Sequence, residues 1–226
     1  MTIIYEVIYL TKFEILLDDI TKIKFDAIVN AANTSLLGGG GVDGAIHRAC
    51  GDKLLEECRT LNGCLIGKSK MTKSYNLIEH GVYWVIHTVG PIYRNSGSEE
   101  KYLRNAYRSV LDVAVNYSDY YTKQINEYIN KNLYLFNTNK FTENKQKDFL
   151  IKDCKDYIEE HPIKTIAFPS ISTGAYSYPL KEACSIALDE ILTFIEKSPD
   201  IFDEIAIVCI DEKTYTAFKA LYEEKL

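Results

Sequence analysis

An aspartate and a histidine follow a run of four glycines and stand one helical turn apart. The glycines are Gly38 to Gly41, and Asp43 and His47 lie at i and i+4, which places both side chains on one face of a helix. Because glycine has no Cβ, this loop can take positive φ and turn successive N–H groups toward an anion. The stretch therefore offers an anion-binding loop with a polar helix face directed at it.

The elements on either side of the glycines distinguish a linker from a binding loop. Ala27 to Val29 form an apolar run of strand type, and a helix with an apolar face follows the glycines. Linkers have polar flanks, whereas phosphate sites in α/β folds place a strand, a loop and a helix within about 25 residues. Neither standard phosphate fingerprint fits, because no Lys-Ser or Lys-Thr follows and Val42 and Asp43 break the dinucleotide spacing. A flexible joint with a helix-capping Asp43 is the alternative.

The whole stretch resembles the first ligand loop of macrodomains, specifically of the macroD-type branch of ADP-ribosyl hydrolases. The matching residues are Asn30-Ala31-Ala32-Asn33 and the run from Leu36 to His47. Ile86 to Pro91 is similar to the end of the family's middle strand, and Ile166 to Tyr176 is similar to its second ligand loop. The resemblance covers about residues 12–115 and 149–226 and leaves a central segment unmatched.

The resemblance implies ADP-ribose as the ligand and assigns residues to its parts. Asp19 and Ile20 would lie against the adenine, although the sequence alone favours Asp19 as a helix cap. Tyr176 would stack against the distal ribose, with loop packing as the alternative, and Asn33 would fix that ribose. The other expected ligand-binding residues are Gly39, Gly40, Gly41, Val42, Ser172, Thr173, Gly174 and Ala175. The chain departs from the family's pattern at Asp18 and Ser177, where the family usually or often has glycine.

The resemblance also implies a hydrolase that removes ADP-ribose from acidic side chains of proteins and deacetylates O-acetyl-ADP-ribose. Asn33, Asp43 and His47 would be the catalytic residues. Asp43 would hold or deprotonate the water, and His47 would orient the Asp43 carboxylate or the substrate. A helix N-terminus favours the ionised form of a carboxylate, so we expect Asp43 to be a weak base that shares the proton transfer with a substrate phosphate.

Two other functions compete with this one. A module that binds ADP-ribose or ADP-ribosylated proteins without catalysis would use the same glycines and Tyr176, but it leaves the pairing of Asp43 with His47 unexplained. A nucleotide phosphatase or a dinucleotide-dependent oxidoreductase would need a metal cluster or the G-x-G-x-x-G spacing. His80 and His161 lie in polar turns with no second ligand at metal-binding spacing, so we expect no metal and no cofactor.

The alternation of strands and helices predicts a three-layer α/β/α sandwich around a mixed, mostly parallel sheet. The cleft should lie where the loops after the strands at Ala27 and Thr165 converge, at the carboxyl ends of those strands, and the helix after Pro179 should direct its dipole at a phosphate. His87 is expected to be a hydrogen-bonded core histidine. The expected strands are Ile3 to Leu10, Phe13 to Leu17, Ala27 to Val29, Met71 to Leu77, Val82 to Val89, Thr165 to Pro169 and Ile205 to Ile210. One expected helix begins after Gly41. The others cover Lys53 to Leu61, Glu99 to Val115, Leu180 to Glu196 and Lys213 to Lys225.

We expect residues 1–226 to form a single domain with an inserted surface segment at about 116–147. This segment is rich in Asn, Lys and Tyr and should contribute little to the core. It is expected to be partly helical from Thr122 to Leu133 and mobile from Asn137 to Lys147. A partner-binding or substrate-gating element is the alternative.

Composition limits the cellular context. A net charge of −6 and a pI near 5.3 argue against a nucleic-acid surface but not against an anionic ligand held by backbone N–H groups. The six cysteines have no metal-binding or disulfide pattern and are expected to be reduced core thiols. No apolar run reaches membrane-spanning length, and the first ten residues make a poor signal peptide. We therefore expect a cytoplasmic monomer whose partners are ADP-ribose and ADP-ribosylated proteins.

Overall fold

A six-stranded sheet forms the centre of the computed structural model, which describes residues 11–132 and 140–225. The strand order is β1-β6-β5-β2-β4-β3, and neighbouring strands are parallel except for β3, which pairs with β4 in the antiparallel direction. The predicted mixed, mostly parallel sheet is therefore confirmed, whereas the expected strand from Ile3 to Leu10 lies outside the described residues. The strands are β1 Lys12–Leu17, β2 Ala27–Ala31, β3 Ser69–Lys73, β4 Trp84–Thr88, β5 Thr165–Phe168 and β6 Glu204–Cys209.

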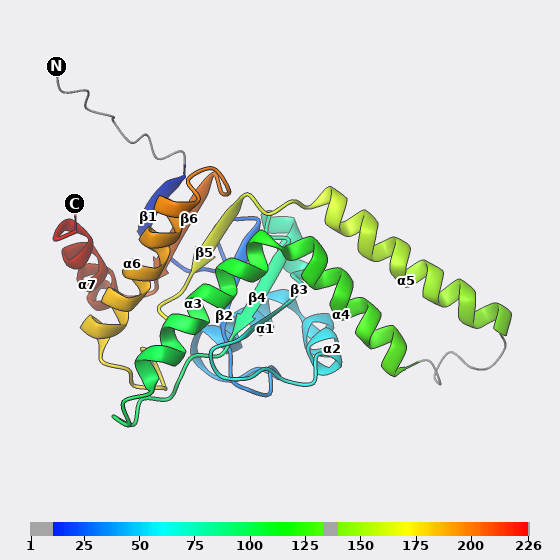
Figure 1. Cartoon of the computed structure of the whole chain (residues 1–226), viewed down its shortest axis with the longest axis horizontal. Helices are drawn as coiled ribbons and strands as arrows, with labels where there is room; N and C mark the ends of the chain where they lie inside the picture. Colours follow the sequence, from blue (N-terminus) through cyan, green and yellow to red (C-terminus); the bar gives the residue numbers. More distant parts are fainter. Residues whose placement is uncertain (1–10, 133–139, 226) are drawn as a thin grey trace, which may run out of the picture.

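Helices cover both faces of this sheet (Figure 1). The helices are α1 Gly41–Cys50, α2 Asp52–Thr60, the 3₁₀-helix η1 Tyr75–His80, α3 Glu99–Val115, α4 Tyr117–Lys131, α5 Lys140–Glu160, α6 Leu180–Lys197 and α7 Glu212–Glu223. Successive strand residues point to opposite faces. Ile28 and Val85 join the core beneath α1 and α2, while Val29 and Ile86 join the core beneath α3, α6 and α7. This arrangement confirms the predicted three layers.

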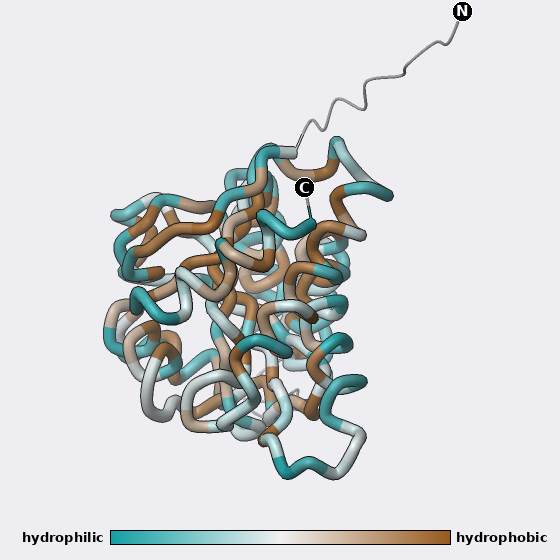
Figure 2. Tube along the Cα trace, turned by 90° about the vertical axis from the view of Figure 1, so that its left-hand side faces the viewer, coloured by the Kyte–Doolittle hydropathy of each residue, from teal (hydrophilic) through white to brown (hydrophobic). Residues whose placement is uncertain are grey.

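The apolar faces of the helices explain how the layers hold together. In α3, Leu103, Tyr107, Val110 and Ala114 recur at spacings of three and four and are buried. Figure 2 shows hydrophobic stretches of the chain gathered between the layers and hydrophilic stretches on the outer turns of the helices. No helix within residues 11–132 and 140–225 is both long and apolar enough to cross a membrane.

The expected strand from Met71 to Leu77 is wrong beyond Lys73, where β3 ends. Tyr75 has a φ of 54°, a left-handed conformation that a strand cannot contain, and η1 begins at this residue. The Tyr75 hydroxyl donates to Glu57 Oε2 at 2.7 Å, which ties the turn to α2.

The segment at 116–147 contributes more to the core than the sequence suggested. Tyr121 and Ile129 of α4 are buried, and the Gln124 side chain bonds both the N–H and the carbonyl of Met71 in β3. Residues 140–147 belong to α5 rather than to a mobile loop, and 137–139 lie outside the described residues. α4 and α5 pack against each other and extend away from the β3 edge of the sheet (Figure 1).

Candidate active site

A cavity of about 590 Å³ opens at the carboxyl ends of β2, β5 and β6. This is the position at which parallel α/β sheets bind ligands. All of the predicted site residues except His47 line it. They are Asp19, Ile20, Asn33, Gly39, Gly40, Gly41, Val42, Asp43, Ser172, Thr173, Gly174, Ala175 and Tyr176. The cavity thus brings together the loops after β1, β2 and β5.

Two glycines allow the first loop to lie close against α1. A Cβ at Gly44 would overlap the carbonyl oxygen of Gly39, so α1 needs a glycine where the loop crosses it. A Cβ at Gly39 would lie 3.0 Å from Asp43 Oδ2 and 3.3 Å from Asn33 Nδ2. The Asn33 amide in turn donates to the Gly38 carbonyl at 2.8 Å. The loop is therefore packed between Asn33 and Asp43, with the N-terminus of α1 at the cavity wall.

Asp43 is 4% exposed and lies in the first turn of α1. Its Oδ1 accepts a hydrogen bond of 2.7 Å from the Asn30 side-chain amide. Burial raises the pKa of Asp43, and the Asn30 bond and the nearby His47 offset only part of that effect. Our expectation of a weak base was therefore wrong in direction, because the loss of water around the carboxylate outweighs the helix dipole.

His47 lies one turn further along α1, outside the cavity lining. Its Nε2 is 3.5 Å from Asp43 Oδ1 and has no hydrogen-bond partner among the described residues. Burial lowers the pKa of His47, and the Asp43 charge offsets part of that effect. In this structure Asn30 therefore holds the Asp43 carboxylate, and the role expected of His47 remains a prediction.

A chain of buried polar groups continues behind Asp43 into the sheet. Asn30 Nδ2 lies 3.0 Å from His87 Nδ1, and His87 Nε2 lies 3.0 Å from Thr72 Oγ1. His87 is completely buried, as predicted for a core histidine, and burial lowers its pKa to about 3. The sequence marked Asn30 only as part of a motif. Its partners could not be found without the strand order, which places β2 beside β4.

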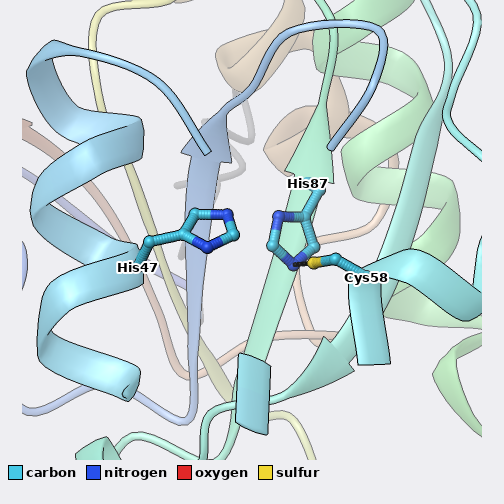
Figure 3. Close-up of side chains that lie close together, drawn as sticks. All are labelled: His47, Cys58 and His87. Atoms are coloured by element: carbon cyan, nitrogen blue, oxygen red, sulfur yellow. Dashed lines mark hydrogen bonds between the residues drawn. The ribbon is translucent and has the colours of Figure 1, made fainter. Parts of the chain in front are cut away.

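One group of possible metal ligands occurs within the described part of the chain. It consists of His47, Cys58 and His87, whose candidate ligand atoms lie within 4.8 Å of one another (Figure 3). The spacing rules missed this group because its members come from α1, α2 and β4. In the state seen here the group does not fit a cation. The Asn30 amide donates to His87 Nδ1, which leaves the proton on Nε2, the nitrogen that faces Cys58.

The second loop, after β5, closes on itself. Tyr178 N–H donates to the Ser172 carbonyl at 3.0 Å, and Ser177 N–H donates to the Gly174 carbonyl at 2.9 Å. Ser177 has a φ of 54°, which agrees with the glycine that the family often has there. Ser172 Oγ is buried at the cavity wall with no partner among the residues described. Gly41 at the start of α1 lines the cavity and no residue of α6 does, so the use of the α6 dipole stays a prediction.

The opposite end of the cavity contains Asp19 and a wall that the sequence did not predict. Asp19 Oδ1 accepts from the Thr21 N–H at 3.0 Å and from its hydroxyl at 2.7 Å. Asp19 therefore caps a turn, and no helix follows it before β2. The unpredicted wall comes from the end of β6 and the start of α7. Its residues are Val208, Cys209, Ile210, Asp211 and Thr214. The rule that ligands lie at the carboxyl ends of parallel strands could have found them.

Comparisons with known proteins give a consistent result. A model of the Macro domain family matches residues 29–120 and 137–187. A Macro domain-containing protein of Methanosarcina mazei is 38% identical over 202 residues, which cover 89% of this chain and 82% of that protein. ADP-ribose glycohydrolase MACROD1 of Mus musculus is 37% identical over 210 residues, which cover 92% of this chain and 49% of that protein. The structure of a Trypanosoma brucei macrodomain in complex with ADP-ribose matches with a TM-score of 0.66 and 33% identity, covering 93% of this chain and 68% of that one.

Proposed function

This chain belongs to the macrodomain family, and we propose that it is a hydrolase that removes ADP-ribose from acidic side chains of mono-ADP-ribosylated proteins. The observation that carries the proposal is a buried carboxylate of raised pKa, Asp43, at the wall of the cavity. The name of the mouse relative, an ADP-ribose glycohydrolase, and the ADP-ribose bound to the trypanosome macrodomain support the same reaction and ligand.

We infer that each part of ADP-ribose would meet a complementary group in the cavity. Asp19 and Ile20 would hold the adenine, because Asp19 Oδ2 has only a 3.5 Å contact to Lys22 Nζ and can accept from the amino group. The diphosphate would lie between the N–H groups of the glycine loop and those of residues 172–175, near the positive end of α1. The distal ribose would then lie beside Asn33 and Tyr176, with its substituent facing Asp43.

The chemistry that follows is general-base hydrolysis of an ester. Asp43 would accept a proton from water while the water oxygen bonds to either the ribose carbon or the acyl carbon of the ester. The bond from that carbon to the bridging oxygen breaks, which releases the glutamate carboxylate in the first case and the ribose oxygen, which then takes up a proton, in the second. A raised pKa makes the carboxylate a better base, which favours this role. If the ribose carbon is attacked, the carboxylate leaving group needs no strong acid to expel it, whereas the guanidine of an arginine linkage does. O-acetyl-ADP-ribose is an ester of the same kind and is a second expected substrate.

One observation favours a second function, an ADP-ribose-binding module without catalysis. His47 Nε2 makes no hydrogen bond to Asp43 in this structure, so the two side chains do not form a bonded acid–base pair. Such a module would bind ADP-ribose in the same cavity and release nothing.

The release of ADP-ribose from defined substrates tests the proposal. Purified protein should free ADP-ribose from a target modified on glutamate and leave an arginine-linked target largely intact. Hydrolysis in ¹⁸O-labelled water would place the label on the ribose or on the glutamate and so identify the attacked carbon. Binding of ADP-ribose without release from the glutamate-linked target would favour the binding module.

A further inference from the structure

Asn30 stands between the proposed base and a buried histidine. The side chain is completely buried, and its amide has two hydrogens with an acceptor for each. One acceptor is Asp43 Oδ1 at 2.7 Å, and the other is His87 Nδ1 at 3.0 Å. The Asn30 carbonyl oxygen is buried with no hydrogen-bond partner in the described part of the chain.

These neighbours fix the orientation of the amide. Rotating it by half a turn would place the Asn30 carbonyl oxygen against the Asp43 carboxylate, where two acceptors face each other. An unpaired buried carbonyl is itself unfavourable. Its presence indicates that donation to both Asp43 and His87 outweighs that cost. The Asp43 carboxylate requires this orientation, and His87 Nδ1 stabilises it by accepting the second amide hydrogen.

The same geometry fixes the tautomer of His87. Since Nδ1 accepts from Asn30, the proton of the neutral ring is on Nε2, where Thr72 Oγ1 lies at 3.0 Å and Cys58 Sγ at 3.7 Å. Burial lowers the pKa of His87 to about 3, which agrees with a ring that stays neutral. Figure 3 shows the His87 ring between Cys58 and His47.

Asn30 and His87 both belong to the central strands of the sheet. Asn30 and His87 are paired in the register of β2 and β4, and β4 is flanked on its other side by β3. Asp43, in contrast, lies on α1 and faces the cavity. The hydrogen bonds therefore connect the helix that carries the reacting carboxylate to two paired strands of the sheet.

We propose that His87 is a positioning residue for the hydrolysis and holds the Asp43 carboxylate in place through the amide of Asn30. The inference rests on the proposed function, because it concerns the geometry of the proposed base. His87 does not line the cavity. In this proposal it takes no proton in the reaction. It acts by keeping one Asn30 hydrogen on Asp43 Oδ1, so that the other carboxylate oxygen is directed at the water.

Two substitutions at the same position separate positioning from packing. His87→Leu removes the acceptor, and we expect kcat to fall about tenfold or more while the Kd for ADP-ribose changes less than about threefold. His87→Asn places its Oδ1 near the site of Nδ1, keeps the acceptor for Asn30, and should recover most of the lost kcat. In an Asp43→Ala background, His87→Leu should cause no further loss, because residues that act as a unit are not additive.

Several results would overturn the proposal. They are an unchanged kcat in an active His87→Leu protein, an equal loss in His87→Asn, or a further loss in the Asp43→Ala background. Should wild type release no ADP-ribose from the ester, the proposed function fails and this inference fails with it. An active wild type with a silent His87→Leu refutes the inference alone.

A spectroscopic measurement on wild-type protein covers the case in which His87→Leu does not fold. ¹⁵N NMR of the labelled imidazole should show His87 as the neutral Nε2–H tautomer from about pH 8 to pH 5, given its lowered pKa. An Nδ1–H tautomer would contradict the proposal, because Asn30 could not then donate to both neighbours. Loss of the Nε2–H signal on addition of Zn²⁺ would also contradict it, since His87 would then be a metal ligand.

Discussion

Two opposing effects act on the Asp43 carboxylate. Its position in the first turn of α1 favours the charge, whereas burial removes the water that would solvate it, and burial wins. An acid whose pKa is raised in the folded state stabilises the fold below its ordinary pKa of 3.8. That contribution is lost as the pH rises through the raised folded value. Asp43 therefore costs stability at neutral pH, as functional residues often do.

The cost of a charged Asp43 at neutral pH leads to a prediction about the stability of the Asp43→Asn variant. Asparagine keeps an acceptor for the Asn30 amide but carries no charge, so the variant should melt at a higher temperature than wild type at pH 7. The difference should shrink as the pH falls toward the ordinary aspartate pKa, where wild-type Asp43 is also neutral. Thermal melts of both proteins across this pH range provide the test. A variant that is less stable than wild type at pH 7 would show that burial does not raise this pKa.

Asp19 has a structural role and a proposed binding role that one substitution can separate. Its Oδ1 bonds Thr21, and its Oδ2 is the oxygen proposed to accept from the adenine amino group. Asp19→Asn should keep the bonds to Thr21 but present an amide N–H₂ to the adenine. We expect it to weaken ADP-ribose binding by about 1–3 kcal/mol in calorimetry, with little change in melting temperature. Unchanged affinity would remove Asp19 from the adenine site.

At the scale of elements, helices with a periodic aliphatic pattern were predicted well, whereas the packing of the tyrosine-rich helix α4 was predicted poorly. The stripe of α3 gave its bounds, Glu99–Val115, because aliphatic residues recur at helical spacing. In α4 the buried positions are Tyr121 and Ile129, eight residues apart among Asn, Lys and Tyr. The Tyr121 ring packs against Trp84, and its hydroxyl donates to Glu57, two contacts that depend on distant residues. No local pattern could predict them.

The packing of α4 yields a prediction about stability. Ile129→Ala should lower the free energy of unfolding by about 2–5 kcal/mol, since the side chain is 1% exposed and its removal leaves a cavity. Asn130→Ala, at the next and exposed position, is the matched control and should change stability little. Because α4 does not line the ligand cavity, affinity for ADP-ribose should be the same in both. Chemical denaturation measures the free energy of unfolding, and equal stabilities of the two variants would show that the packing of Ile129 contributes little.

At the scale of the whole molecule, the features that could be predicted from the sequence were those formed by contiguous stretches of the chain. The glycine loop and the loop after β5 identified the family and the cavity walls, because each is a continuous run at the end of a strand. Asn30 and His87 are 57 positions apart and meet only through the pairing of β2 with β4. The wall at the end of β6 likewise required the strand order. Groups assembled across strands thus remained hidden until the topology was known.

The central claim is that Asp43 acts in the chemical step and not in holding the ligand. The most direct test is to measure kcat on a glutamate-linked target and Kd for ADP-ribose in wild type and Asp43→Asn. Asp52→Asn, the same change at an exposed position on α2, is the matched control. We predict that Asp43→Asn lowers kcat by about 10²-fold or more and changes Kd by less than about threefold, while Asp52→Asn changes neither. An unchanged kcat, or equal losses in kcat and affinity, would contradict the account.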